Sequence, residues 1–183
     1  KEMFETMKLC VGCKGCKREC PTGVDMARMK TEFLYHYKKR HGLSLFNWII
    51  SYLPRYAPFV SRFPWFLNAR NKFYVLRYFM EKLVGISAKR ALPNWDLNPF
   101  SQEFNKQSSL DSNSKEVVLF ADTFNTYFEP ENLRSAYKIL TAAGYTVIIA
   151  QSKDRNRPLC CGRTFLASGL LDEAKEEASR SID

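Results

Sequence analysis

The sequence lacks several features that mark common protein classes. It has no run of 18 apolar residues, which excludes an ordinary transmembrane helix. We find no secretory signal, internal repeat, phosphate-binding glycine loop, nucleophile elbow or paired-carboxylate site. The only histidines, His36 and His41, flank a short basic run and fit surface polar positions better than metal ligands. Asp122 and Asp154 have no evident catalytic partner, so we expect them to cap helices or lie in loops.

All six cysteines lie in two tight groups. Four cysteines fall between Cys10 and Cys20, and Cys160 and Cys161 are adjacent. A disulfide framework would instead disperse its cysteines along a secreted chain. The clusters therefore predict metal or redox chemistry in a reducing, cytoplasmic compartment.

The first group has the spacing C-x2-C-x2-C-x3-C-P, formed by Cys10, Cys13, Cys16, Cys20 and Pro21. Closely spaced thiolates can bind neighbouring irons of one compact cluster, and glycines at positions 12 and 15 help the backbone to turn tightly. This spacing is typical of bacterial ferredoxins and favours a [4Fe–4S] cluster. Zinc remains an alternative, although structural zinc sites usually use two separated pairs of ligands. Free thiols or disulfides are further alternatives.

The same rule predicts an incomplete site. In two-cluster ferredoxins the cysteine before proline binds the second cluster, so Cys20 would serve a neighbour of the cluster held by Cys10, Cys13 and Cys16. No cysteine precedes Cys10, and both chain ends fall inside helical patterns. We therefore expect a segment of a longer protein, which in its intact form holds up to two clusters.

The middle of the chain carries the basic charge. The chain has a net charge of +9, and residues 28–90 contain 13 Lys and Arg against two acids. Residues 22–42 predict a helix capped near Thr22 and Asp25 and ending at Gly42, and residues 43–93 predict short amphipathic helices joined at prolines. The aromatic and basic side chains of this region fit a packed helical core with a charged rim. Contact with an anionic membrane that gives access to quinone is an alternative, and nucleic acid is not expected.

The C-terminal part has a different pattern. Residues 94–115 are polar and rich in Asn and Ser, as in a linker. Beyond them we predict a strand over 116–122, a helix over 130–144, a parallel strand over 145–151 and a helix from about residue 168. The predicted fold class is α+β, with a helical cysteine segment at 1–42, aromatic and basic helices at 43–93, the linker and a small βαβ domain at 116–183.

Both ends of the chain resemble one protein family. The stretch "CVGCKGCKRECPTGVDMARMKTEFLYHYKKRHG" resembles the second iron–sulfur motif of FAD-linked oxidoreductases of the D-lactate, glycolate and D-2-hydroxyglutarate dehydrogenase type. It is also similar to the iron–sulfur subunits of glycolate oxidase and anaerobic glycerol-3-phosphate dehydrogenase. The tail, "VVLFADTFNTYFEPENLRSAYKILTAAGYTVIIA" and "RPLCCGRTFLASGLLDEA", resembles the cysteine-rich CCG domain.

The resemblance implies an electron-transfer role. It implies an α-helical ferredoxin-like segment that conducts electrons away from FAD, which belongs to a flavin domain or subunit outside this chain. It also implies a second redox or cluster site at Cys160 and Cys161, although Thr123 stands where many relatives have a cysteine. Two small cysteines at a turn are the simpler interpretation of that pair. The alternative function is a non-catalytic zinc-binding or structural interaction segment, and peripheral contact with the inner membrane face is an alternative location.

Overall fold

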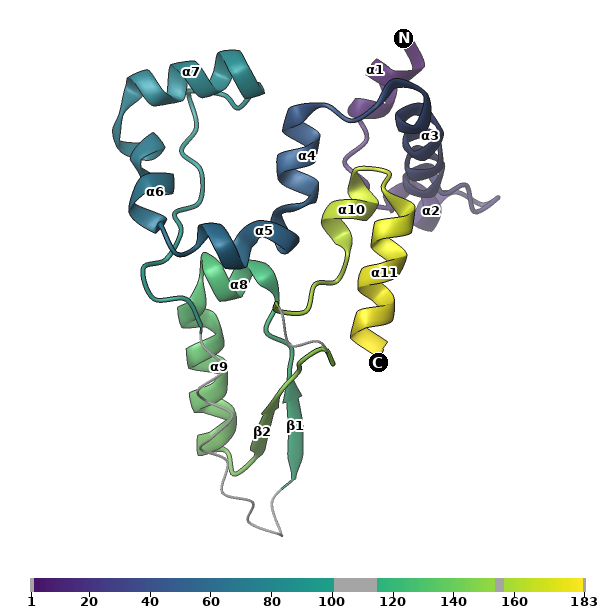
Figure 1. Cartoon of the computed structure of the whole chain (residues 1–183). Coiled ribbons are helices and arrows are strands. Elements are labelled where there is room, and N and C mark those ends of the chain that lie inside the picture. The colour runs from purple at the N-terminus through teal and green to yellow at the C-terminus, as the bar shows by residue number, and fades with distance from the viewer. Residues whose placement is uncertain (1, 101–114, 154–156, 183) are drawn as a thin grey trace. The chain divides into compact units, whose positions relative to one another are not determined.

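The computed structural model describes residues 2–100, 115–153 and 157–182 and is mostly helical, with a two-stranded parallel sheet (Figure 1). This confirms the α+β class. The chain forms two compact units. Unit 1 comprises Lys1–Tyr52 and Gly162–Ala178, and unit 2 comprises Leu53–Cys161 and Ser179–Asp183. The four domains predicted from the sequence remain a prediction. Within the described ranges, no helix is both long and apolar enough to cross a membrane.

Unit 1 is built around the predicted helix after the cysteines. Its elements are α1 (Glu2–Lys8), α2 (Gly15–Glu19), α3 (Met26–His41), α4 (Leu45–Ser51), α10 (Arg163–Ala167) and most of α11 (Leu171–Ile182). Asp25 caps α3 by accepting the Arg28 N–H at 3.0 Å, and Gly42 ends it with a φ of 77°. The expected cap at Thr22 was wrong, because Thr22 precedes the helix and its hydroxyl contacts Cys20 instead.

Residues from the C-terminal part complete the interior of unit 1. Phe165 of α10 is fully buried, and its ring meets the edge of Tyr52 at a centroid distance of 5.3 Å. The Ser51 hydroxyl donates to the Ser168 hydroxyl at 2.6 Å, and the Tyr52 hydroxyl donates to Glu173 at 2.8 Å. Polar contacts and one aromatic pair therefore join α4 to α10 and α11.

The first helices of unit 2 are α5 (Leu53–Val60), α6 (Pro64–Lys72) and α7 (Tyr74–Val84). They confirm the short helices predicted for this region. Pro64 begins α6, as expected, but Pro58 lies inside α5 rather than at a joint. Helix α5 continues past it because the missing donor removes one hydrogen bond only, and the Ser61 N–H still bonds the Ala57 carbonyl at 3.0 Å.

The expected aromatic core is also wrong for much of this region. Helix α7 has no buried residue, and most of the large side chains of α6 and α7 face solvent. In α6 the buried residues are Pro64 and Arg70, and Arg70 has only 2 % of its surface exposed. Its guanidinium donates to the carbonyls of Ser87 and Arg90 at 2.9 and 3.2 Å. This arginine fixes the segment after α7 by binding its backbone.

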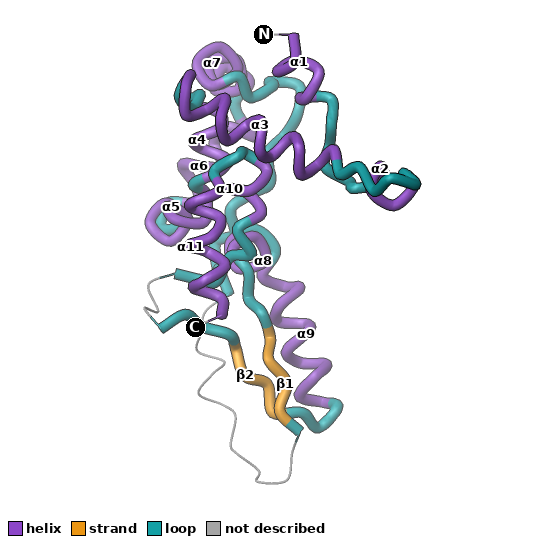
Figure 2. Tube along the Cα trace, turned by 90° about the vertical axis from the view of Figure 1, so that its right-hand side faces the viewer, coloured by secondary structure: helices purple, strands orange, loops and turns teal. Residues whose placement is uncertain are grey.

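The sheet lies in the second half of unit 2. Strands β1 (Glu116–Leu119) and β2 (Thr146–Ile149) pair in parallel, with Val117 opposite Val147. Helix α9 (Pro130–Ala142) connects them and lies along the sheet in Figure 2. The predicted strand–helix–strand order is confirmed, whereas α8 (Thr123–Tyr127) and α10 were not predicted. Their five residues are too few to show helical periodicity.

The apolar interior of unit 2 includes part of the predicted linker. Phe100, Ala121, Leu133 and Ile149 form one buried cluster. The N–H groups of Asp96 and Phe100 bond the carbonyls of Tyr127 and Thr126 at 2.9 and 3.0 Å. Residues 94–100 therefore pack against α8. Residues 101–114 of the predicted linker lie outside the described residues.

Candidate metal centre

The cysteine-rich segment of unit 1 turns twice with left-handed backbone. Gly12 has a φ of 70°, and Lys14 has a φ of 61°, which non-glycine residues rarely adopt. The two turns bracket Cys13, and α2 then carries Cys16 and ends at Cys20. Cys13 and Cys16 are exposed, whereas Cys10 and Cys20 are partly buried. The four thiols thus occupy a short loop and a single helical turn at the surface of unit 1.

Two of the four sulfurs have hydrogen-bond partners. The Met26 N–H donates to Cys16 Sγ at 3.3 Å. Cys20 Sγ lies 3.1 Å from the Thr22 hydroxyl. This hydrogen bond lowers the pKa of the Cys20 thiol, and the Val24 N–H lowers it further. Hydrogen bonds to sulfur stabilise the thiolate, which is the form that binds metals. Thr22 belongs to the segment that leads into α3, and Met26 is the first residue of that helix.

Basic residues tie the loop to α3. The Lys30 ammonium donates to the Cys10 carbonyl at 2.5 Å. The Lys17 ammonium lies 3.7 Å from the Asp25 carboxylate. The pKa of Asp25 is lowered, chiefly because the carboxylate accepts the Arg28 N–H, with a further contribution from the nearby Lys14 and Lys17. The loop therefore contacts α3 at its start and one turn further along.

The chemistry of the four donors fits an iron–sulfur cluster. Closely spaced thiolates are soft ligands that suit iron–sulfur clusters or zinc. The described residues nevertheless include no group of three or more His, Cys, Asp or Glu side chains close enough together to hold a metal ion. The segment supplies the right ligand type, but its sulfurs do not converge in this conformation.

The second pair of cysteines belongs to unit 2. Cys160 is buried with 3 % of its surface exposed, and Cys161 is exposed. A parallel bridge joins Asp122 to Leu159. Thr123 and Cys160 are the residues that come directly after this bridged pair. Thr123 is fully buried, and its hydroxyl has no hydrogen-bond partner. The structure thus brings Thr123 to the level of Cys160.

The remaining candidate residues have structural roles. Asp122 caps α8 by accepting the N–H groups of Phe124 and Asn125, which confirms the expected cap. His36 lies 3.1 Å from Glu32, and His41 stacks on Tyr37 at a centroid distance of 4.1 Å. Both histidines are exposed. Asp154 lies outside the described residues.

Sequence reasoning missed a pocket beside the cysteine loop. It has a volume of about 430 Å³ and is lined by residues of the loop, α3, α10 and the start of α11. Arg28, Lys30 and Arg163 contribute positive charge to it. The number of Lys and Arg residues near the cysteines was evident from the sequence. The contribution of Arg163 was not, because it depends on packing between distant parts of the chain.

The chain is similar to two kinds of oxidoreductase component. It is 23% identical over 167 residues to the D-2-hydroxyglutarate dehydrogenase of Haemophilus influenzae, an alignment that covers 86% of this chain and 16% of that protein. It is 20% identical to the D-2-hydroxyglutarate dehydrogenase of Escherichia coli (strain K12), over 100% of this chain and 18% of that protein. It is 25% identical to the probable glycolate oxidase iron-sulfur subunit of Bacillus subtilis, over 100% of this chain and 43% of that protein.

These similarities cover only part of each relative. The chain spans less than a fifth of the length of the two dehydrogenases and less than half of the glycolate oxidase subunit. No family model and no solved structure matches the chain. The distant relatives of this chain therefore include D-2-hydroxyglutarate dehydrogenases and an iron-sulfur subunit. Each relative extends well beyond the region that it shares with this chain.

Proposed function

We propose that this chain is the iron–sulfur electron-transfer segment of an FAD-linked 2-hydroxyacid oxidoreductase. The observation that carries the proposal is the cysteine loop, where the ferredoxin spacing coincides with hydrogen bonds to two of the sulfurs. The names of the relatives support it, since they are dehydrogenases of a 2-hydroxyacid and an iron-sulfur subunit. The ferredoxin-like and CCG-type domain assignments belong to the same proposal.

Each cysteine has a role in this proposal. Cys10, Cys13 and Cys16 would hold a [4Fe–4S] cluster, and Cys20 would bind a neighbouring one in the intact protein. Such clusters accept and release single electrons when bound. The Met26 N–H and the Thr22 hydroxyl stabilise negative charge on the sulfurs they contact. Substrate oxidation would occur at FAD in a partner domain or subunit.

Anaerobic reconstitution with iron and sulfide tests the proposal. We expect about four irons per chain, with Cys20 or a second copy of the chain supplying the fourth ligand, and a broad absorption band near about 400 nm that bleaches on reduction. Cys13→Ser should abolish the band, whereas the matched change Cys161→Ser, at an exposed cysteine outside the loop, should leave it unchanged. Stoichiometric zinc without a visible band would favour the structural alternative and overturn the proposal.

About eight irons per chain would have a different meaning. That result would indicate a second cluster, and loss of about half of the iron in Cys161→Ser would assign it to Cys160 and Cys161. Retention of all iron in that variant would limit this pair to a structural role. An EPR spectrum of the reduced protein distinguishes bound cluster from iron that is merely adsorbed.

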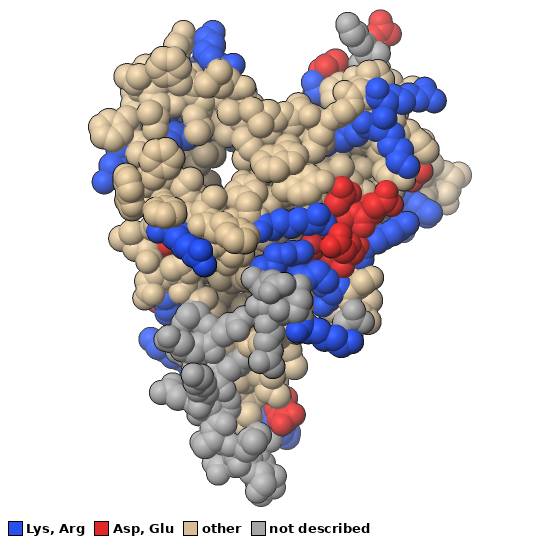
Figure 3. All heavy atoms as spheres, viewed as in Figure 1, with Lys and Arg blue, Asp and Glu red and all other residues tan. Residues whose placement is uncertain are grey.

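We also propose that the parent protein contacts a membrane through the exposed aromatic side chains of unit 2. We call this set the aromatic band, and its members are Phe59, Phe63, Trp65, Phe66, Phe73, Tyr74, Tyr78 and Phe79. The surface over α6 and α7 is largely uncharged, with scattered Lys and Arg (Figure 3). Exposed aromatic rings bordered by cations are typical of surfaces that bind at the interface of anionic lipids.

Vesicle flotation tests the membrane contact. We expect binding to vesicles that contain phosphatidylglycerol and weaker binding to phosphatidylcholine vesicles. Replacing both Trp65 and Phe66 with Ser should reduce binding by at least fivefold. The control Ile139→Ser changes a residue of α9 that is equally exposed, at 68 %, and should have no effect. Equal binding by all variants, or none by the unchanged chain, would contradict the contact and favour a protein partner such as the flavin domain.

A further inference from the structure

The pocket beside the cysteine loop is lined by both charged and apolar side chains. Five cations line it, Lys14, Lys17, Arg28, Lys30 and Arg163, against the two carboxylates of Asp25 and Glu32. Its apolar lining residues are Val11, Ala27, Leu166, Ala167 and Leu171. All of these residues belong to unit 1. A volume of about 430 Å³ lies in the usual range for small-molecule sites.

Both carboxylates already have partners. Asp25 caps α3 and lies near Lys17, and Glu32 contacts His36. Lys30 is bound to the Cys10 carbonyl, which is a neutral acceptor. Among the residues that the structure describes, Lys14, Arg28 and Arg163 have no carboxylate within 4.0 Å. Three cationic side chains therefore face one pocket without a neutralising side chain.

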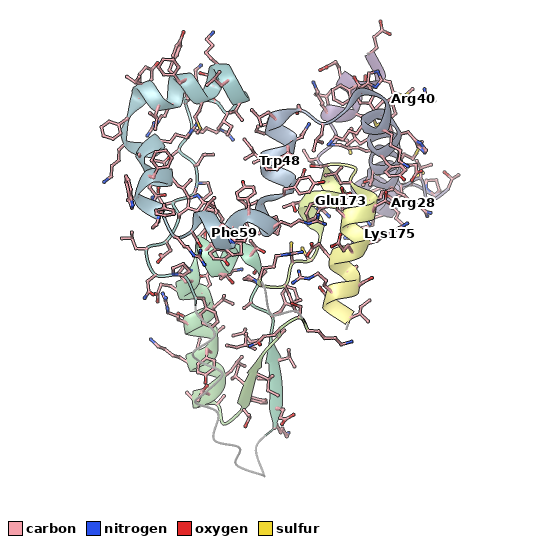
Figure 4. The ribbon with its side chains drawn as sticks, viewed as in Figure 1. Arg28, Arg40, Trp48, Phe59, Glu173 and Lys175 are labelled. Carbon is pink, nitrogen blue, oxygen red and sulfur yellow. The ribbon has the colours of Figure 1, made fainter. Side chains whose placement is uncertain are left out.

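The backbone around Arg163 places its guanidinium near the loop. A Cβ added at Gly12 would lie 3.7 Å from Arg163 Nη2. Residue 162 is a glycine with a φ of 71°, and a Cβ there would lie 3.1 Å from the Ala174 carbonyl of α11. The close approach of α11 thus sets where α10 begins. Arg28 lies near the start of α3 and Arg40 near its end (Figure 4).

We propose that this pocket binds a small organic anion with a doubly charged head and a short apolar part. Arg28 and Arg163 would bind the head, because guanidinium groups form paired hydrogen bonds with phosphate and carboxylate oxygens. Lys14 would add charge, and Leu166 and Leu171 would contact the apolar part. The proposal goes beyond electron transfer and needs no bound cluster, since none of its ligand-binding groups is a cysteine.

Titration of the full chain by two-dimensional NMR tests the site. The probes are phenyl phosphate, phthalate and inorganic phosphate, each added at constant ionic strength. We expect saturable shifts of the Gly12, Thr31 and Ala167 amides with phenyl phosphate, phthalate or both. Comparing the two dissociation constants shows whether the site prefers a phosphate or a dicarboxylate head, because the probe that binds more tightly carries the preferred group. The dissociation constant of phenyl phosphate should be at least tenfold lower than that of inorganic phosphate, because only phenyl phosphate can contact the apolar lining residues.

Matched variants connect the shifts to the two arginines. Arg28→Gln and Arg163→Gln should each raise the dissociation constant at least tenfold, and Arg163→Lys should raise it less because it keeps the charge. Arg40→Gln changes another exposed arginine of the same helix and should alter it by less than twofold. Failure of both organic probes to saturate would overturn the proposal, as would equal losses in Arg40→Gln and Arg28→Gln. Binding only of acidic peptides would replace it with a protein interface.

Discussion

Gly169 lies directly against the backbone of Leu34. A Cβ added at residue 169 would be 2.6 Å from Leu34 Cβ and 2.8 Å from the Leu34 carbonyl carbon. Gly169 also has a φ of 73°, which disfavours any side chain. The turn between α10 and α11 can therefore pack on the middle of α3 only because residue 169 is a glycine.

This contact predicts a large effect of one added methyl group. Gly169→Ala should lower the free energy of unfolding by about 3 kcal/mol or more, because strain from the positive φ adds to a clash with backbone atoms. Gly23→Ala is the matched control in the same unit, since Gly23 has a φ of 69° but no heavy atom within 4 Å of the added Cβ. It should cost about 1–2 kcal/mol. Urea denaturation measures both, and equal losses would contradict the close packing.

Lys38 predicts a specific pH dependence. Its ammonium donates to the Ser168 carbonyl, and burial lowers its pKa from an ordinary value of 10.5 to about 8. Between these two pH values the unfolded chain binds the proton and the folded chain does not, so the free energy of unfolding should rise as the pH increases from about 8 to 10.5. Below pH 8 this contribution is constant and unfavourable.

Lys38→Met isolates this contribution. Urea denaturation at pH 7.5 and 9.5 should show a smaller gain in the variant than in the unchanged chain. Other lysines and the cysteines titrate in both proteins, so their effects cancel in the difference. The same gain in both proteins would show that Lys38 keeps its ordinary pKa in the folded chain.

Thr123 predicts a stabilising substitution. Its hydroxyl is buried without a partner, and an unsatisfied buried polar group costs about 1–3 kcal/mol. Thr123→Val keeps the shape and removes that group, so it should raise the free energy of unfolding of unit 2 by about 1 kcal/mol. Thr141→Val is the control, because the Thr141 hydroxyl donates to the Tyr137 carbonyl at 2.8 Å. A loss of stability in Thr123→Val would mean that the hydroxyl is satisfied.

Arg70 should be essential for the segment that follows α7. Arg70→Gln removes bonds to the carbonyls of Ser87 and Arg90 and should lower the free energy of unfolding by about 3 kcal/mol. Arg62→Gln, at an exposed position, should change it by less than about 0.5 kcal/mol. Hydrogen exchange near the buried Ala88 should accelerate only in the Arg70 variant. Unchanged exchange there would show that the segment is held by other contacts.

Local signals in the sequence predicted the elements whose ends are set by neighbouring residues. Asp25 and Gly42 bound α3, and Pro130 begins α9, because capping involves residues within one turn. The paired strands were also predictable from their apolar runs. The contacts of Arg70, Gly169 and Arg163 were not, since each depends on residues far away in the chain. The ligand types of the candidate centre follow from cysteine spacing alone, whereas the positions of the sulfurs depend on the fold.

Because α10 and the first part of α11 belong to unit 1, that unit is interrupted in the sequence by residues 53–161. During synthesis the cysteine loop and α3 leave the ribosome long before Phe165 and Gly169, which complete their packing. Closing so long a loop slows folding, since its entropy is lost before the contacts form. The thiols of the nascent chain therefore stay exposed until the last part of the chain has been synthesised. A fragment that stops at Tyr52 would retain the cysteines without the packing that supports them.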